Sequence, residues 1–182
     1  MLPLIKRNTT LQGDIFYSHF DVQNHHKVID SILSAALNQK IECKQIPLND
    51  KGRPDFSSYG MDANWTHSKN TCVLVYSFNA RVGVDLEFYK KRKHIRLARR
   101  FFNREETSLI ESLPESQSLE LFYKLWCRKE AYYKCFGGSF FEGSLKVSML
   151  NEDSGAYSFW EPDLGVLEER LDYSCCIISA FQ

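Results

Sequence analysis

The residues best suited to chemistry are acidic and basic side chains in two short segments of the chain. Asp85 and Glu87 are two residues apart, so on an extended strand both carboxylates project from the same face. Glu130 and Lys134 are four residues apart, which places them on one face of a helix. Three carboxylates on two rigid elements, with a lysine beside them, are suited to binding a hard cation such as Mg²⁺ and a phosphorylated substrate.

The elements that must position these side chains are a strand through residues 83–87 and a helix from about residue 118 to residue 135. The apolar segment 72–78 is typical of a second strand, and the short turn after it predicts that the two strands pair as a hairpin. Gly137 and Gly138 are expected to end the helix. The sequence therefore predicts a strand and a helix that present their acidic residues to one site.

The rest of the chain alternates between strand and helix patterns. Residues 1–12 are expected to be a mobile lead-in, and a strand is expected at 14–20. Apolar residues at helical spacing predict a helix from Asp21, as its N-cap, to about Gln39. Further strands are expected at residues 145–150, 157–160 and 173–179. The order strand, helix, strand thus occurs once before and once after residue 95, which predicts an α+β fold with two similar lobes.

Composition indicates a globular protein, because 43% of the 182 residues are hydrophobic and 14% are aromatic. The formal net charge is zero, which argues against a wholly basic nucleic-acid-binding protein. The chain contains no run of about eighteen apolar residues, and its first residues lack the pattern of a signal peptide. A cytoplasmic protein without a membrane segment is therefore expected.

The six cysteines show no Cys-x-x-Cys spacing, and several lie in apolar segments. They are expected to be reduced, buried thiols, not disulfide partners or zinc ligands. Cys175 and Cys176 are adjacent in a predicted strand, so their side chains should point to opposite faces of the sheet.

The segments that carry the chemistry also resemble a known family. They read Gly-Val-Asp-Leu-Glu at 83–87 and Trp-Cys-Arg-Lys-Glu-Ala-Tyr-Tyr-Lys at 126–134. Similar family elements precede them or lie between them, namely Gly-Arg-Pro at 52–54, Asn-Trp-Thr-His-Ser at 64–68 and Arg-Phe-Phe-Asn-Arg-Glu-Glu at 100–106. In order and spacing, from roughly residue 45 to residue 180, the chain resembles the 4′-phosphopantetheinyl transferases. It looks like a compact member of their larger, surfactin-synthetase-activating type.

The resemblance implies an α+β fold of two pseudo-symmetric α/β lobes with the active site between them. Residues 1–92 would form the N-terminal lobe and residues 93–182 the C-terminal lobe of one transferase domain. The implied reaction transfers 4′-phosphopantetheine from coenzyme A to a serine of an apo acyl or peptidyl carrier protein, and adenosine 3′,5′-bisphosphate is released. A monomer is expected.

The resemblance also implies roles for individual residues. Asp85, Glu87 and Glu130 would hold Mg²⁺ or Mn²⁺, since both ions accept oxygen ligands. Glu130 would act as the base that removes the serine proton, and Lys134 would stabilise the charge on the phosphates. The contacts to coenzyme A are expected from five polar side chains, Arg53, His67, Ser68, Lys129 and Lys134.

Some of these residues also have simpler explanations. Asn103 and Glu106 fit a capping box at a helix start, whereas the family places a carboxylate at the position of Glu106 near the metal. Lys129 could form a salt bridge instead of contacting the coenzyme. His25 and His26 could be ordinary surface residues or contacts for the 3′-phosphate of coenzyme A.

The stretch 90–104 contains eight Lys or Arg residues and no acidic residue. Such a stretch could steer an acidic carrier protein to the active site, or it could bind RNA. Two other classes of function therefore stay open beside the transferase. One is an RNA-binding module, and the other is a non-catalytic relative that binds coenzyme A or a carrier protein without transfer.

Overall fold

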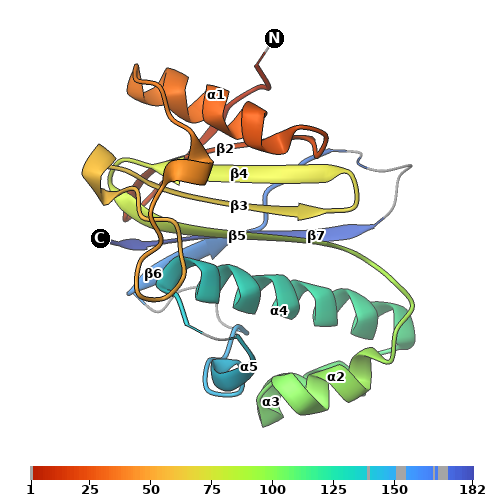
Figure 1. Ribbon diagram of the computed structural model, residues 1–182. Coiled ribbons are helices and arrows are strands. Elements are labelled where there is room, and N and C mark those ends of the chain that lie inside the picture. The colour runs from red at the N-terminus through yellow and green to blue at the C-terminus, as the bar shows by residue number, and fades with distance from the viewer. Residues whose placement is uncertain (1, 139, 151–154, 166, 168–171) are drawn as a thin grey trace.

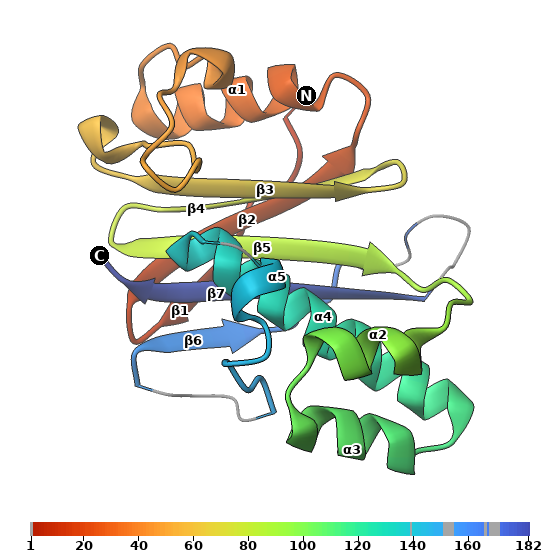
Figure 2. The ribbon, with the colours of Figure 1, turned by 60° about the horizontal axis from the view of Figure 1, so that its bottom comes forward.

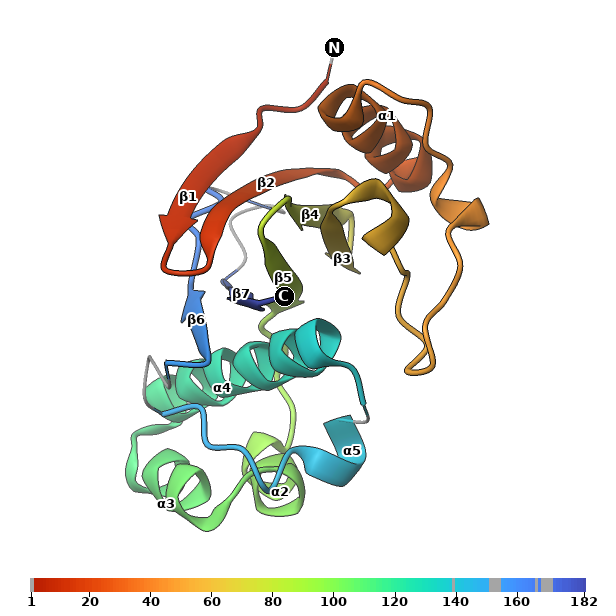
Figure 3. The same cartoon turned by 90° about the vertical axis from the view of Figure 1, so that its left-hand side faces the viewer.

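The computed structural model describes residues 2–138, 140–150, 155–165, 167 and 172–182. It stacks a helix, two antiparallel sheets and a group of helices in successive layers, which are seen end-on in Figure 3. The predicted α+β fold is confirmed. Within the described residues, no helix is both long and apolar enough to cross a membrane.

The first sheet has the strand order β1-β2-β4-β3. Its members are β1 (Lys6–Thr10), β2 (Gly13–Asp21), β3 (Asp62–Ser68) and β4 (Thr71–Ser77). Helix α1 (His25–Leu37) covers its outer face (Figure 1), where Ile29 and Leu33 pack with Leu74 in one buried cluster. The short helices η1 (Cys43–Gln45) and η2 (Ser57–Tyr59) lie in the connection from α1 to β3.

The second sheet has the order β5-β7-β6, formed by β5 (Ala80–Phe88), β7 (Tyr173–Phe181) and β6 (Tyr157–Trp160). Alternate residues of β5, namely Val82, Val84 and Leu86, are buried in the core between the two sheets. The residues between them, Asp85 among them, project from the opposite face, where α4 lies. The alternation that the sequence predicts for this strand is therefore present.

The predicted hairpin between β4 and β5 is wrong. Both edges of β4 are occupied, because it pairs with β2 on one side and β3 on the other. The chain turns after Ser77, and β5 pairs along its whole length with β7. The strand that carries the acidic pair thus belongs to a different sheet from the strand that precedes it.

The remaining helices pack below the second sheet (Figures 1 and 2). They are α2 (His94–Phe101), α3 (Arg104–Ser112), α4 (Glu115–Phe136) and α5 (Phe140–Gly143). Phe122 and Leu125 of α4 share a buried cluster with Cys176 and Ile178 of β7. The predicted end of α4 is confirmed, since Gly137 is its C-cap.

Several other expectations differ from the structure. The first twelve residues include strand β1, and residues 145–150 form no strand. Asn24 is the N-cap of α1, and Asp21 instead accepts a hydrogen bond from the amide of Gln23. All six cysteines are free and buried, as predicted. Cys175 and Cys176 lie in different clusters on opposite faces of the sheet, also as predicted.

The division into lobes at residue 92 stays a prediction. The pairing of β5 with β7 joins the two segments in one sheet. Each segment also supplies a helix layer, with α1 from the first and α4 from the second (Figure 3).

Candidate active site

A glycine allows α4 to lie directly on β5. A Cβ atom at Gly83 would lie 2.2 Å from the carbonyl oxygen of Ala131 and 2.6 Å from the amide nitrogen of Cys135. No other residue fits this approach without moving backbone atoms. The close contact brings the last turns of α4, with Glu130 and Lys134, beside Asp85 two residues further along β5.

Asp85 and Lys134 form an ion pair at this contact. The distance from Nζ of Lys134 to Oδ1 of Asp85 is 2.6 Å, and Nζ also lies 3.1 Å from the hydroxyl of Thr66 on β3. The Thr66 hydroxyl donates to the same Oδ1 at 3.3 Å. Burial alone would lower the pKa of Lys134, but the charges of Asp85 and Glu130 outweigh it, so the pKa is raised and the ammonium is retained.

The three predicted carboxylates lie within electrostatic range of one another. Burial, followed by the charges of Asp85 and Glu87, raises the pKa of Glu130 to about 7, although Lys134 opposes the shift. Burial and Asp85 also raise the pKa of Glu87, with Arg92 and Lys90 opposing. All three residues that the sequence assigned to a metal are therefore near enough to affect one another's ionisation, and their negative charges are only partly compensated.

This donor set fits a hard cation in its chemistry. Oδ2 of Asp85 is buried and has no hydrogen-bond partner, which is costly for a carboxylate oxygen unless a cation or water satisfies it. A divalent cation would also relieve the repulsion that raises the pKa of Glu130. In the described part of the chain, however, no three Asp, Glu, His or Cys side chains are arranged to hold a metal ion. The carboxylates would have to move together to coordinate one.

Side chains of β3 connect the two sheets beside this site. Oδ2 of Asp62 accepts the amide of Val82 at 2.7 Å, and Oδ1 of Asn64 accepts the amide of Val84 at 3.0 Å. With Thr66, these side chains form a regular series along β3 that faces β5. The series fixes the edge of β5 and thereby the position of Asp85.

A cavity of about 250 Å³ opens beside Glu130 and Lys134. Its walls are the loop at residues 51–54, Asn64 of β3, and Glu130, Tyr133 and Lys134 of α4, with Phe140 beyond the helix end. The loop is tied to α4, since Nζ of Lys51 donates to the carbonyl of Phe136 at 2.9 Å. The cavity thus lies between the loop that precedes β3 and the end of α4.

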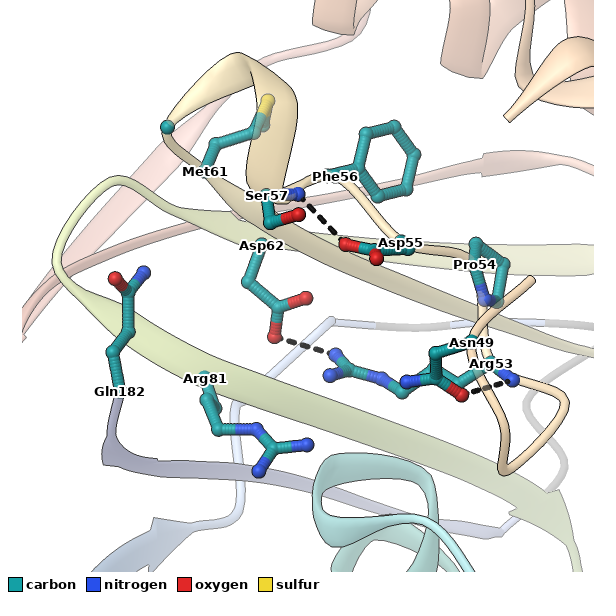
Figure 4. Close-up of a pocket in the computed structure, with 11 residues that line it drawn as sticks. Asn49, Arg53, Pro54, Asp55, Phe56, Ser57, Met61, Asp62, Arg81 and Gln182 are labelled. Carbon is teal, nitrogen blue, oxygen red and sulfur yellow. Dashed lines mark hydrogen bonds and ion pairs between the residues drawn. The ribbon is translucent and has the colours of Figure 1, made fainter. Parts of the chain in front are cut away.

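Arg53 lies inside the protein, although the sequence assigns it to the coenzyme. Its Nη2 contacts Oδ2 of Asp62 at 2.5 Å and the carbonyl of Val82 at 2.6 Å. Figure 4 shows this side chain reaching Asp62 across a second cavity of about 310 Å³, which shares Arg53 and Pro54 with the first. Only 8% of Arg53 is exposed, so its main contacts anchor the loop to both sheets.

Lys129 lies away from the cavity, which corrects its assignment as a coenzyme contact. The side chain is fully buried, and its Nζ lies 2.9 Å from Oε2 of Glu106 and 2.7 Å from the carbonyl of Ser144. It also donates to the carbonyl of Val147. Burial lowers the pKa of Lys129, and the ion pair with Glu106 offsets only part of this effect. Lys129 therefore holds the segment after α5 against α4.

Glu106 has the helix-capping role that its spacing predicts. Asn103 and Glu106 form a complete capping box at the start of α3. Oε1 of Glu106 also accepts the amide of Met149 at 2.8 Å, and Oε2 faces Lys129. Both carboxylate oxygens are thus engaged in the interior of the protein.

His67 and Ser68 lie at the end of β3, where the β3–β4 hairpin turns. The ring of His67 is 5.6 Å from the ring of His25 on α1, and His25 is 4.2 Å from His26. Lys44 is close enough to help to lower the pKa of His26, after burial and His25. Sequence reasoning missed Lys44 and this grouping, because the three segments are brought together only by the tertiary fold.

The basic stretch adjoins the acidic site. Arg92 and Lys90 act on the pKa of Glu87, as noted above, and Arg96 and Arg100 are exposed on α2. Arg99 pairs with Glu111 of α3 at 2.5 Å. The exposed face of α2 therefore carries positive charge at the border of the site.

Comparison with known families gives a match over the part of the chain that carries β5, α4 and the start of β7. The model described as the 4′-phosphopantetheinyl transferase superfamily matches residues 81–173, which is just over half of the 182 residues. The matched part includes Asp85, Glu87, Glu130 and Lys134.

Curated relatives carry the same description. The chain is 30% identical over 115 residues to 4′-phosphopantetheinyl transferase HetI of Nostoc sp., which covers 60% of this chain and 48% of HetI. It is 33% identical over 97 residues to 4′-phosphopantetheinyl transferase AcpT of Escherichia coli K12, covering 52% of this chain and 50% of AcpT. The chain is 32% identical over 89 residues to 4′-phosphopantetheinyl transferase gsp of Aneurinibacillus migulanus, covering 49% of this chain and 36% of gsp. The matches thus span half or less of these three relatives.

Proposed function

Because the chain belongs to the 4′-phosphopantetheinyl transferase superfamily, we propose that it transfers 4′-phosphopantetheine from coenzyme A to a serine of an apo acyl or peptidyl carrier protein. The serine oxygen forms a bond to the β-phosphorus of the coenzyme pyrophosphate. The bond from that phosphorus to the bridging oxygen breaks, and adenosine 3′,5′-bisphosphate leaves. The serine proton passes to a base of the protein.

Glu130 is the base in this proposal. Without metal, burial and neighbouring charges raise its pKa to about 7; a bound cation would lower this pKa, so the carboxylate would be ionised and able to accept the serine proton. It lines the cavity beside Lys134, so both groups face the space that a substrate would occupy. Lys134 keeps its positive charge and stabilises the negative charge that builds up on the phosphates during transfer.

Asp85, Glu87 and Glu130 would hold the metal ion of the reaction, Mg²⁺ or Mn²⁺. When bound, such an ion neutralises pyrophosphate charge and stabilises the leaving group. The unpartnered Oδ2 of Asp85 and the raised pKa values of both glutamates support this assignment. Thr66 and Lys134 orient Asp85 through its other oxygen.

The coenzyme contacts are proposed from Lys134, His67 and Ser68. The grouping of His67 with His25, His26 and Lys44 offers several nitrogen donors for the 3′-phosphate. We propose that Arg53 acts through the loop that it anchors to Asp62. Lys129 has no part in this set, because its ammonium is fully buried in other contacts.

The partner is an acidic carrier protein that approaches over α2. Its negative surface would be attracted to the exposed Arg96 and Arg100, which raises the association rate. A cytoplasmic location and a monomeric state complete the proposal. The observation that carries all of it is that Lys134 pairs with Asp85 and lines one cavity with Glu130, within the matched segment.

The test is intact-mass spectrometry of an apo acyl carrier protein and an apo peptidyl carrier protein. Each is incubated with the protein, coenzyme A and Mg²⁺. The expected result is a mass gain of one phosphopantetheine on at least one carrier, abolished by EDTA and by Asp85→Ala. Arg7→Ala, which changes an exposed ion pair on β1, is the matched control and should retain full activity.

A folded protein that binds coenzyme A but modifies neither carrier would favour the non-catalytic relative. Salt-sensitive RNA binding that persists in Asp85→Ala, without transfer, would favour the RNA-binding module instead. Either result contradicts the proposed transferase.

A further inference from the structure

Residues 89–93 connect the acidic strand β5 to the basic helix α2 and form neither strand nor helix. The connection passes beside the first half of α4 (Figure 1), where a tyrosine of that helix holds it. The amide of Lys90 donates to the hydroxyl of Tyr123 at 2.9 Å, and the hydroxyl donates to the carbonyl of Lys90 at 3.3 Å. One hydroxyl group thus satisfies both backbone groups of a residue that lies outside the sheets and helices.

The aromatic ring of Tyr123 contacts two neighbours of Lys90. The guanidinium carbon of Arg92 lies 5.3 Å from the centroid of this ring, within the range of a cation–π contact. The ring of Tyr89 stacks on the ring of Tyr123, with 4.8 Å between the centroids and 11° between the planes. Tyr123 is itself fully buried in α4. It is therefore a fixed support for the connection and for the side chain of Arg92.

Lys90 and Arg92 lie between the predicted metal site and the exposed face of α2. Burial raises the pKa of Glu87, and the charges of Arg92 and Lys90 oppose this shift, so both cations are close to that carboxylate. Further along the chain, Arg96 and Arg100 are four residues apart and share a face of α2. Basic side chains therefore continue from α2 to the border of the acidic site.

A carrier protein must bring its serine to the acidic site, so the part of the carrier nearest that serine would meet the border at Lys90 and Arg92. We infer that Tyr123 is a positioning residue for the carrier, because it holds these two cations where acidic side chains beside the acceptor serine can contact them. The inference rests on the proposed function and extends the docking surface from α2 to the border of the site. A connection that is already held in place loses less conformational entropy when the carrier binds.

Steady-state kinetics with an apo carrier protein tests this role. Tyr123→Phe keeps the ring and removes only the hydroxyl. Arg92→Gln removes the charge, and a double variant carries both changes. Tyr173→Phe is the matched control, because its hydroxyl also accepts a loop amide, that of Leu164, at 2.9 Å and donates to the next carbonyl at 3.3 Å. That loop packs in the core between the two sheets, away from α2.

We expect Tyr123→Phe and Arg92→Gln each to raise KM for the carrier about fivefold at low salt, because charge at such a surface acts on encounter. The double variant should match either single variant within about twofold, since both changes act on the same contact. The values of kcat and of KM for coenzyme A should stay within about twofold of wild type, a pattern that a general loss of stability would not produce. Tyr173→Phe should leave KM for the carrier unchanged.

The role of Tyr123 would be overturned by an unchanged carrier KM in Tyr123→Phe, by an equal rise in Tyr173→Phe, or by an equal rise in KM for coenzyme A. It would also be overturned if the two effects multiply to about 25-fold in the double variant, since they would then be independent. If Tyr123→Phe does not fold, hydrogen exchange of the Lys90 amide in wild type and the carrier KM of Arg92→Gln decide. An unprotected amide or an unchanged KM would then contradict the inference. Wild-type protein that modifies no carrier would instead overturn the proposed function.

Discussion

Nζ of Lys134 lies 2.6 Å from Oδ1 of Asp85, and this contact joins the end of α4 to the middle of β5. It leaves Oδ2 of the same carboxylate buried without a partner. One oxygen is thus held by a fixed cation while the other remains available. The arrangement orients Asp85 before any ligand binds, which is the condition for an effective electrostatic site.

The first prediction concerns Lys134. Lys134→Met should lower kcat by about 100-fold or more, because the charge on the phosphates would lose its fixed counterion. Carrier modification followed by mass spectrometry measures this rate. Lys124→Met on the same helix is the control, since the ion pairs of Lys124 with Glu120 and Glu161 lie at the surface and their loss should cost little. A Lys134→Met rate within fivefold of wild type would refute the assignment.

The second prediction concerns the pH dependence of stability. The pKa of Glu130 is about 7 in the folded protein and 4.5 in the reference state. The folded protein therefore holds this proton more tightly, so the stability from Glu130 is fully present below pH 4.5 and is lost as pH rises through 7. The Glu130→Gln variant has no ionisable group at this position, so it does not lose this stability as pH rises. Its Tm should fall less than that of wild type between pH 5 and pH 8.

Thermal unfolding at pH 5, 6, 7 and 8 without metal measures this difference, at about 2–4 °C for each kcal/mol. Mg²⁺ at pH 8 should raise the Tm of wild type more than that of Glu130→Gln. If the Tm values of the two proteins change in parallel with pH, the pKa of Glu130 is not raised in the folded state.

The third prediction separates Lys129 from the chemistry. Lys129→Met should destabilise the protein by about 3–5 kcal/mol, because Glu106 would remain buried without its cation. The double variant Lys129→Met/Glu106→Gln carries no unpaired charge and should be more stable than Lys129→Met alone. Urea unfolding measures both. The folded fraction of Lys129→Met should keep transfer activity within about threefold, and a loss as large as that of Lys134→Met would restore a coenzyme role.

The fourth prediction concerns the exposed face of α2. Arg96→Glu with Arg100→Glu should raise KM for an acidic carrier protein roughly tenfold at low salt and leave kcat unchanged, because charge on this surface acts on encounter. The difference from wild type should shrink as salt is added. Lys40→Glu, at an exposed position after α1, is the matched control. An unchanged KM in the α2 variant would place the carrier elsewhere.

The fifth prediction concerns Gly83. Gly83→Ala should cost about 3 kcal/mol or more, because its Cβ atom would meet backbone atoms of Ala131 and Cys135 that cannot move independently. Gly60→Ala is the comparison, since that position has positive φ but no atom within 4 Å and should cost about 1 kcal/mol. Urea unfolding distinguishes the two, and similar losses would argue against the close packing of α4 on β5.

Much of the site could be predicted because its signals are local. The alternation of residues 83–87 and the four-residue spacing of Glu130 and Lys134 each lie within one element, and one element fixes which side chains share a face. The capping box of Asn103 and Glu106 is also local. These predictions needed no knowledge of how the elements pack.

The parts that could not be predicted depend on contacts between distant segments. Strand β5 pairs with β7, whose residues lie 85 to 101 positions later in the chain, so the hairpin with β4 was a reasonable but wrong inference. Lys129 is next to Glu130, yet successive helix residues are about 100° apart, so it faces Glu106 and the segment after α5. Arg53 was assigned to the coenzyme from its place in a family motif, and its contact with Asp62 could not be predicted from spacing.

The six free cysteines are buried, so each becomes reactive only when the part of the protein around it unfolds. Cys43 and Cys72 lie in the cluster under α1, and Cys175 lies between the sheets. The third group lies in the cluster between α4 and the second sheet, namely Cys127 and Cys135 of α4 and Cys176 of β7. Each thiol is shielded from alkylating reagents while its own layer is closed. Pulsed alkylation followed by peptide mapping would therefore show the order in which the layers separate, with no label introduced into the chain.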